Sequence, residues 1–108
     1  MDREGFDGAM EVCTPPPRDE ANQEAIWNGV ATGLFQVVSS DHAPFRFDNP
    51  LGKLLNGRNA PFNKIPPGIP GIEVRLPILF SEGVGSGRLD LNRFVALGMT
   101  NHAKLYGL

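Results

Sequence analysis

The sequence has little of what marks several classes of protein. It contains one cysteine, Cys13, which excludes an internal disulfide framework and favours a reducing, cytoplasmic compartment. It has no excess of basic residues, because 10 lysines and arginines stand against 12 aspartates and glutamates and give a formal charge of −2. Proteins that bind nucleic acid or anionic membranes normally carry a clustered basic surface, so we expect neither partner.

Long hydrophobic runs are also missing. No apolar stretch approaches the roughly 18 residues of a membrane-spanning helix. The first dozen residues carry charges where a secretory signal would have an apolar run. Hydrophobic residues nevertheless make up 41% of the chain, which is enough for a core and too many for a disordered tail. We therefore expect a soluble, cytoplasmic protein with no membrane partner.

Glycine and proline are abundant but show no period. The 13 glycines and 10 prolines lie in separate clusters, which excludes collagen-like and repeat architectures. Residues 45–71 form a long segment rich in Asn, Gly and Pro. A loop of this length inside a compact domain is uncommon and is usually functional, so this segment is a candidate for ligand contacts.

The first forty residues predict a strand, a helix and a second strand. Residues 9–13 are compatible with a short strand that the prolines after it would end. Apolar residues recur at helical spacing through 19–32, and Gly33 is a plausible end for this helix, or Gly29 if the helix ends early. The β-branched and aromatic residues of 34–39 predict a buried strand. This order indicates a βαβ unit with parallel strands and a right-handed crossover.

The second half of the chain is predicted to be helical. Residues 72–84 read as a helix, and Pro77 predicts either a kink or a late start. Asp90 is a good N-cap for a further helix over 91–97.

A short last helix is predicted over 101–106, with Thr100 as its cap and Gly107 as its C-terminal residue. The two predicted strands cannot close a sheet by themselves. We therefore expect a piece of a longer α/β protein.

The most informative candidate site lies directly after the second predicted strand, at Asp41 and His42. Ligand-binding and catalytic groups of parallel α/β proteins lie at the carboxyl ends of strands. Asp41 has the chemistry of a metal ligand or a general base, although an Asx-turn role is favoured on this dipeptide alone. His42 is expected to form a hydrogen bond that orients a neighbour, because adjacent residues at a strand end point apart.

The end of the first predicted strand offers a second candidate position. Cys13 fits a buried packing residue better than a nucleophile, because His42 is the one base available to activate it. Thr14 could present backbone or hydroxyl groups to a ligand, or could simply begin the proline turn, and spacing does not decide between these roles. His102, inside the short terminal helix, is expected to face solvent.

Several motifs, in order along the chain, resemble one continuous stretch of the dihydropyrimidinase and hydantoinase family. They are Cys13-Thr14-Pro15-Pro16-Pro17-Arg18, Asn22-Gln23-Glu24-Ala25-Ile26-Trp27 and Gln36-Val37-Val38-Ser39-Ser40-Asp41-His42-Ala43-Pro44-Phe45. The similarity continues through Lys64-Ile65-Pro66, Gly71-Ile72-Glu73-Val74-Arg75-Leu76-Pro77, Phe80-Ser81-Glu82-Gly83-Val84 and Thr100 to Leu108. The resemblance covers nearly the whole chain.

This resemblance implies a fold and a site. The family fold is the (β/α)8 barrel of the metal-dependent amidohydrolases, flanked by a small β-domain. Residues 1–108 would be a part of that barrel, truncated at both ends, with its last two strands and the helices around them. Family members hold two zinc ions, and Asp41 matches the aspartate that binds metal and shuttles a proton. Thr14 and Pro67 fall where the family contacts the substrate ring, although proline lacks the backbone N–H of the usual asparagine.

The resemblance also implies a function for the longer parent protein. It would be a cytoplasmic homotetramer that hydrolyses the ring amide of a cyclic ureide, a dihydropyrimidine or a hydantoin. The chain itself is expected to be inactive, because Asp41 is its only match to the metal ligands. The alternative is a non-catalytic scaffold related to dihydropyrimidinases. Retention of Asp41 favours the enzyme, whereas Pro67 and the truncation favour the scaffold.

Overall fold

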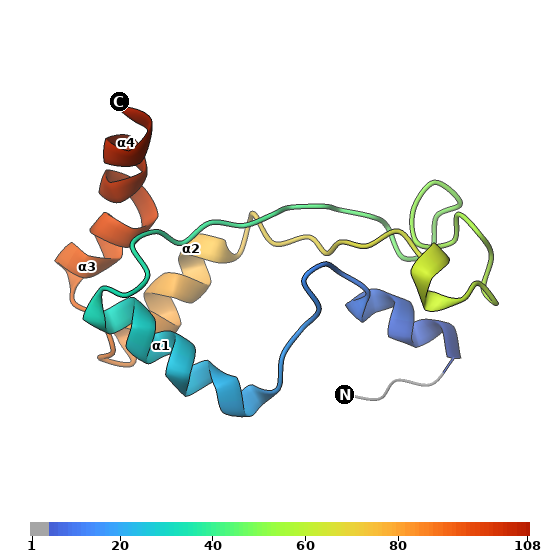
Figure 1. Cartoon of the computed structure of the whole chain (residues 1–108), viewed down its shortest axis with the longest axis horizontal. Coiled ribbons are helices and arrows are strands. Elements are labelled where there is room, and N and C mark those ends of the chain that lie inside the picture. The colour runs from blue at the N-terminus through green and yellow to red at the C-terminus, as the bar shows by residue number, and fades with distance from the viewer. Residues whose placement is uncertain (1–4) are drawn as a thin grey trace. The chain divides into compact units, whose positions relative to one another are not determined.

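The computed structural model describes residues 5–108, which divide into two compact units (Figure 1). Residues 18–40 and 73–108 form one unit, here called the helical unit. Of the described residues, 5–17 and 41–72 form the other, here called the loop unit. Each unit has its own small core, and each is described by itself.

The helical unit begins with a short 3₁₀ turn, η2 (Glu20–Asn22), that leads into α1 (Gln23–Thr32). Gly33 ends α1 with φ = 90°, a left-handed conformation that glycine adopts without the steric penalty of a Cβ. The predicted helix over 19–32 and its end at Gly33 are confirmed.

The second helical stretch starts later than residue 72. It consists of α2 (Arg75–Ile78), which continues without a break into the π-helical segment η4 (Leu79–Gly85). Pro77 falls in the first turn, where the backbone N–H groups have no partner within the helix, so the missing donor removes no helical hydrogen bond. The late start predicted from Pro77 is therefore confirmed.

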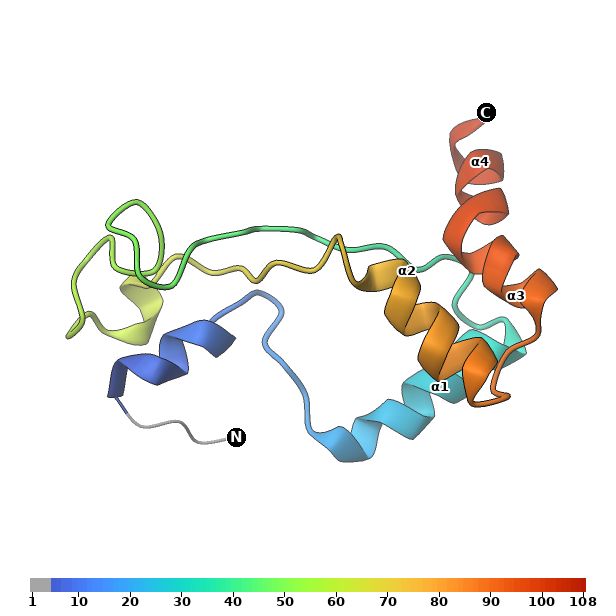
Figure 2. The same cartoon turned by 180° about the vertical axis from the view of Figure 1, so that it is seen from behind.

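The last helical stretch is continuous. It comprises α3 (Leu91–Val95), the π-helical η5 (Ala96–Thr100) and α4 (Asn101–Tyr106) (Figure 2). Asp90 caps its start as predicted, since its Oδ1 accepts a hydrogen bond from the Arg93 N–H at 2.7 Å. The prediction that Thr100 caps a separate helix is wrong, because Thr100 is itself helical and makes no capping bond. Gly107 ends α4 with φ = 71°, as predicted.

The core of the helical unit lies between these helices. Its buried residues come from α1, η4, the following loop and η5, and they are Val30, Leu79, Leu89 and Leu97. Partly buried hydrophobic side chains pack around them: Trp27, Val38, Val84 and Phe94. Gly83 lets the helix approach Leu89 closely, because a Cβ at this position would lie 2.7 Å from Leu89 Cδ1 and would require that side chain to shift.

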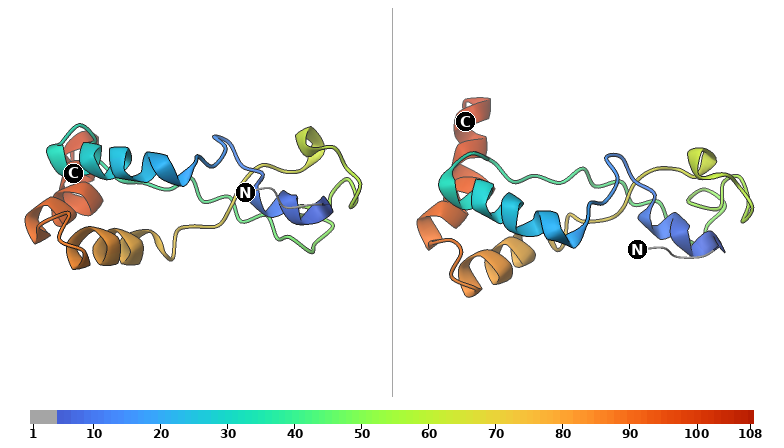
Figure 3. Two further views of the ribbon diagram at one scale, coloured as in Figure 1. Left: turned by 90° about the horizontal axis from the view of Figure 1, so that it is seen from below. Right: turned by 60° about the horizontal axis from the view of Figure 1, so that its bottom comes forward.

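The loop unit contains little regular structure. Its elements are the 3₁₀ helices η1 (Gly5–Glu11) and η3 (Phe62–Lys64), which lie near each other in both views of Figure 3. Ala9 and Ile65 are its buried apolar residues, and the Phe6 and Phe47 rings stack with their centroids 5.2 Å apart. The remainder is turns and extended chain, in agreement with the loop predicted over 45–71.

The strand predicted over residues 9–13 is wrong. Residues up to Glu11 belong to η1, and the Val12 N–H donates locally to the Ala9 carbonyl at 3.3 Å. The Val12 carbonyl, which would face a neighbouring strand in a sheet, instead accepts from the Gly68 N–H at 2.9 Å. The backbone groups find partners in a loop, so no sheet is needed to satisfy them.

The strand predicted over residues 34–39 is also wrong, although this segment is extended after residue 35. Its backbone bonds to helices: the Val38 N–H donates to the Leu97 carbonyl at 3.0 Å, and Asn101 Nδ2 donates to the Gln36 carbonyl at 2.7 Å. These bonds replace a sheet ladder. The portion of the chain from residue 5 to residue 108 contains no strand, so the expected βαβ unit and the last two strands of a barrel are not formed in it.

No helix within the described residues is both long enough and apolar enough to cross a membrane.

We predict that Leu97→Ala destabilises the helical unit strongly. The Leu97 side chain is fully buried among the core residues, and truncation of a buried leucine costs about 2–5 kcal/mol. The free energy of unfolding, measured by urea denaturation with far-UV circular dichroism, checks this. Leu105→Ala is the matched control in the same helical stretch, because Leu105 is 67% exposed. Equal losses in the two variants would contradict the assignment of the core.

Candidate functional site

Thr14 and Pro67, far apart in the sequence, line the same pocket of the loop unit. The pocket has a volume of about 450 Å³ and lies beside η1 and η3. Its other lining residues are Gly8, Glu11, Val12, Cys13, Pro16, Phe62, Asn63 and Ile65. The structure therefore brings together the two positions that resemble ring contacts.

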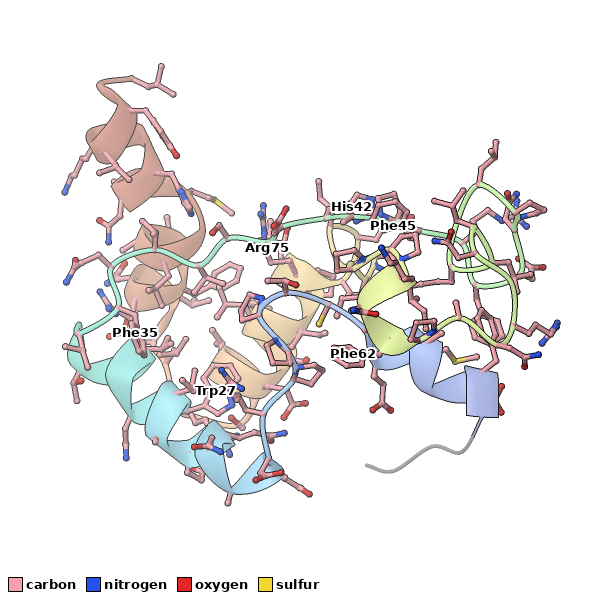
Figure 4. The ribbon with its side chains drawn as sticks, turned by 45° about the vertical axis from the view of Figure 1, so that its right-hand side comes forward. Trp27, Phe35, His42, Phe45, Phe62 and Arg75 are labelled. Carbon is pink, nitrogen blue, oxygen red and sulfur yellow. The ribbon has the colours of Figure 1, made fainter. Side chains whose placement is uncertain are left out.

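The pocket combines apolar walls with few polar groups. Phe62, on η3, is 78% exposed and supplies an aromatic face (Figure 4). The Thr14 hydroxyl and the Asn63 amide offer hydrogen-bonding groups, and Pro67 offers a carbonyl but no N–H. Small-molecule sites are commonly apolar with a few placed polar groups, so this composition suits a small ring with polar edges.

Asp41 lies outside this pocket. It follows the extended segment in the chain and its side chain is exposed, but it is not among the residues that line the pocket with Thr14 and Pro67. The expectation that Asp41 stands at the end of a strand fails with the strand itself. The described residues bring Thr14 and Pro67 together and do not add Asp41 to them.

The described residues do not make up a metal site by themselves. Between residues 5 and 108, no group of three or more His, Cys, Asp or Glu side chains is placed to hold a metal ion. A zinc site needs about three or four protein ligands. The Asp41 carboxylate can serve as one oxygen ligand, and the other ligands of a zinc centre would have to come from elsewhere.

His42, next to Asp41, is fixed by its ring. Its Nδ1 accepts hydrogen bonds from the N–H groups of Gly71 at 3.1 Å and Ile72 at 3.3 Å, which places the ring proton on Nε2. The Ala43 N–H donates to the Ile69 carbonyl at 3.3 Å, so the chain around Ala43 and the chain around Ile69 run side by side (Figures 1 and 4). The predicted orienting role of His42 matches this contact.

Two sequence-based expectations need correction. His102 is half-buried and does not face solvent freely, because its Nε2 lies 3.0 Å from the Val38 carbonyl. Cys13 is half-buried and lines the pocket, so it is not the fully buried packing residue expected. Its Sγ donates to the Pro15 carbonyl at 3.3 Å.

Lys53 is the residue that sequence reasoning missed. It is 2% exposed, and its Nζ donates to the carbonyls of Val12 at 2.6 Å and Pro66 at 2.9 Å. Burial lowers the pKa of Lys53, and the nearby Cys13 side chain acts in the opposite direction through its charged, thiolate form. One signal was available, namely that Lys53 lies among leucines and glycine in an otherwise polar loop.

We predict that Lys53 titrates below the ordinary pKa of a lysine, because its ammonium is removed from water. At pH values between the lowered pKa and the ordinary one, Lys53 keeps its proton in the unfolded chain and has released it in the folded chain. The contribution of Lys53 to folding stability therefore rises with pH across this window. An NMR titration of the side-chain carbons next to Nζ checks this, and a titration at or above the ordinary value would contradict it.

Known hydantoinases and dihydropyrimidinases are similar to this chain both in sequence and in structure. The chain is 43% identical over all of its 108 residues to a D-hydantoinase from Rhizobium radiobacter and 44% identical to one from Geobacillus stearothermophilus. Among solved structures, a D-hydantoinase from Bacillus sp. AR9 matches 96% of the chain with a TM-score of 0.86 and 48% identity. A dihydropyrimidinase from Brevibacillus agri NCHU1002 matches 97% with a TM-score of 0.86 and 46% identity.

The chain spans only 22% of the length of each of these four proteins. No protein-family model matches it.

Proposed function

Since the chain belongs to the D-hydantoinase and dihydropyrimidinase family, we propose that it is part of a cyclic amidase. The parent protein would hydrolyse the ring amide C–N bond of a dihydropyrimidine or a hydantoin. Its catalytic domain would be a (β/α)8 barrel. The chain would then be one segment of that barrel domain.

The pocket shared by Thr14 and Pro67 is the observation that carries this proposal. A cyclic ureide is small and flat, with carbonyl and N–H groups at its edge, and the pocket offers an aromatic ring, a hydroxyl and backbone carbonyls. We assign to Thr14 and Pro67 the role of contacting the ring of the substrate. Thr14 can donate or accept through its hydroxyl, whereas Pro67 can accept through its carbonyl alone.

We assign Asp41 to proton transfer. Hydrolysis requires that a water oxygen bond to the ring carbonyl carbon and that the bond from this carbon to nitrogen break. The water proton must leave, and the departing nitrogen must gain one, so a single carboxylate can accept it first and deliver it later. The carboxylate of Asp41 is exposed, and in the parent protein it would carry out both transfers.

The resemblance also implies two zinc ions in the parent, where they would supply the acidity that activates water. Asp41 would be one of their ligands, and the remaining ligands would lie outside this chain. We extend the proposal to a cytoplasmic homotetramer. The single cysteine is compatible with a reducing compartment.

We predict that a chimera reports the activity. In the Geobacillus stearothermophilus D-hydantoinase, the matched 22% is replaced by this chain, and hydantoin hydrolysis is measured. The chimera should turn over hydantoin, and Asp41→Asn should reduce kcat by about 10²–10⁴-fold because the proton acceptor is lost. Asp48→Asn, which changes an exposed aspartate of the same unit, should leave kcat unchanged.

Full activity of the Asp41→Asn chimera would show that the proton acceptor is another residue. A folded chimera without activity would favour the alternative of a non-catalytic scaffold related to this family.

We predict that the 108-residue chain alone neither binds zinc tightly nor hydrolyses hydantoin. Its described residues place no three potential ligands together, and a catalytic zinc needs about three. Metal analysis of the purified chain and a dihydrouracil or hydantoin assay check this. Stoichiometric zinc accompanied by turnover would contradict the assignment of the site.

A further inference from the structure

Lys53 is a buried charged side chain that the proposed reaction does not use. At 2% exposure, its ammonium has lost its contact with water, a loss that is costly unless polar groups replace the water. Its two carbonyl partners, Val12 and Pro66, supply this replacement at 2.6 and 2.9 Å. Hydrogen bonds to a charged group are stronger than those between neutral groups, so these two contacts hold their acceptors firmly.

Both acceptors stand next to the residues that we assign to the ring. Val12 lies two positions before Thr14, and the Pro66 carbonyl belongs to the peptide group that ends at the Pro67 nitrogen. Because a peptide group is planar and rigid, a bond at its oxygen fixes the orientation of its nitrogen. One ammonium therefore ties together the two segments that carry Thr14 and Pro67 into the pocket.

Lys53 itself is held in place by residues outside the pocket that Thr14 and Pro67 line. The Lys53 N–H donates to the Arg46 carbonyl at 2.9 Å, and the Gly52 N–H donates to the Asn49 carbonyl at 2.8 Å. Gly52 is buried against the Arg46 backbone, where a Cβ would clash. The turn over 46–53 thus presents Lys53 from residues that do not line the pocket with Thr14.

We propose that Lys53 is a positioning residue of this pocket, which holds the Thr14 and Pro67 segments at the spacing a cyclic ureide requires. The ligand in this statement rests on the proposed function, whereas the positioning of the two segments does not. A ligand that finds its contacts already placed binds more tightly, because fewer groups must be ordered on binding.

The first test measures the positioning without a ligand. In the 108-residue chain, Lys53→Met keeps the length of the side chain and removes its donors. The Gly68 amide, which donates to the Val12 carbonyl, should then exchange its hydrogen at least about tenfold faster, because the Val12 segment is released. Lys53→Arg restores donors and should recover much of the protection, and Lys64→Met, at an exposed lysine, should change nothing.

Far-UV circular dichroism shows whether the helical unit of each variant remains folded. If Lys53→Met loses structure throughout, Lys53→Gln, which keeps a polar group, takes its place in the same comparison. Protection of Gly68 equal to that of the unmodified chain in a folded variant would overturn the proposal.

The second test measures the consequence for a ligand in the chimera described above. Lys53→Met should raise the KM for hydantoin about tenfold or more and lower kcat less, because misplaced contacts weaken binding of the ring. Lys53→Arg should restore KM in part, and Lys64→Met should not alter it. An unchanged KM in Lys53→Met would overturn the proposal even if exchange at Gly68 were faster. If the unmodified chimera has no activity, the proposed function fails, and the exchange measurement alone decides the positioning by Lys53.

Discussion

The structure depends on one constraint, which is that backbone N–H and C=O groups away from water must find partners even when no sheet is present. In the helical unit, the extended segment after residue 35 bonds to Leu97 and Asn101 of the last helical stretch. In the loop unit, the Val12 carbonyl accepts from both Gly68 and Lys53. The Leu97 carbonyl, the Asn101 side-chain amide and the Lys53 ammonium thus supply hydrogen bonds that neighbouring strands supply in a sheet.

The features that sequence predicted correctly depend on local chemistry. Gly33 and Gly107 end helices because their left-handed φ angles favour glycine, and Asp90 begins a helix because its carboxylate reaches an N–H three residues ahead. The strands failed because a strand is defined by a partner, and residues 9–13 and 34–39 have none among the residues described. The prediction for Thr100 failed for a different reason. Nothing in its neighbours broke the helix, so its ability to cap was never used.

The site residues also divide into those that the sequence indicates and those that depend on distant partners. Motif resemblance singled out Thr14 and Pro67, but their convergence depends on Lys53, a residue that no motif contains. A buried lysine cannot be recognised from spacing, because its burial is decided by which distant carbonyls come within reach of it. Asp41 differs from Lys53, because it lies in a recognisable motif but its side chain is exposed to solvent. The proton transfer proposed for Asp41 would therefore depend on groups outside this segment, whereas the pocket is lined by residues of the segment itself.

Pro67 is one of the positions at which the chain departs from the family pattern, and it is the one whose departure removes a backbone donor. In the proposed site, the missing N–H would remove one neutral hydrogen bond to the ligand, which is worth about 1 kcal/mol. Proline also restricts its own backbone, and the Pro66 carbonyl before it is held by Lys53. A rigid segment loses less freedom when a ligand binds, which acts in the opposite direction. A proline at this position is therefore compatible with ring binding where Lys53 keeps the Pro66–Pro67 peptide group in place.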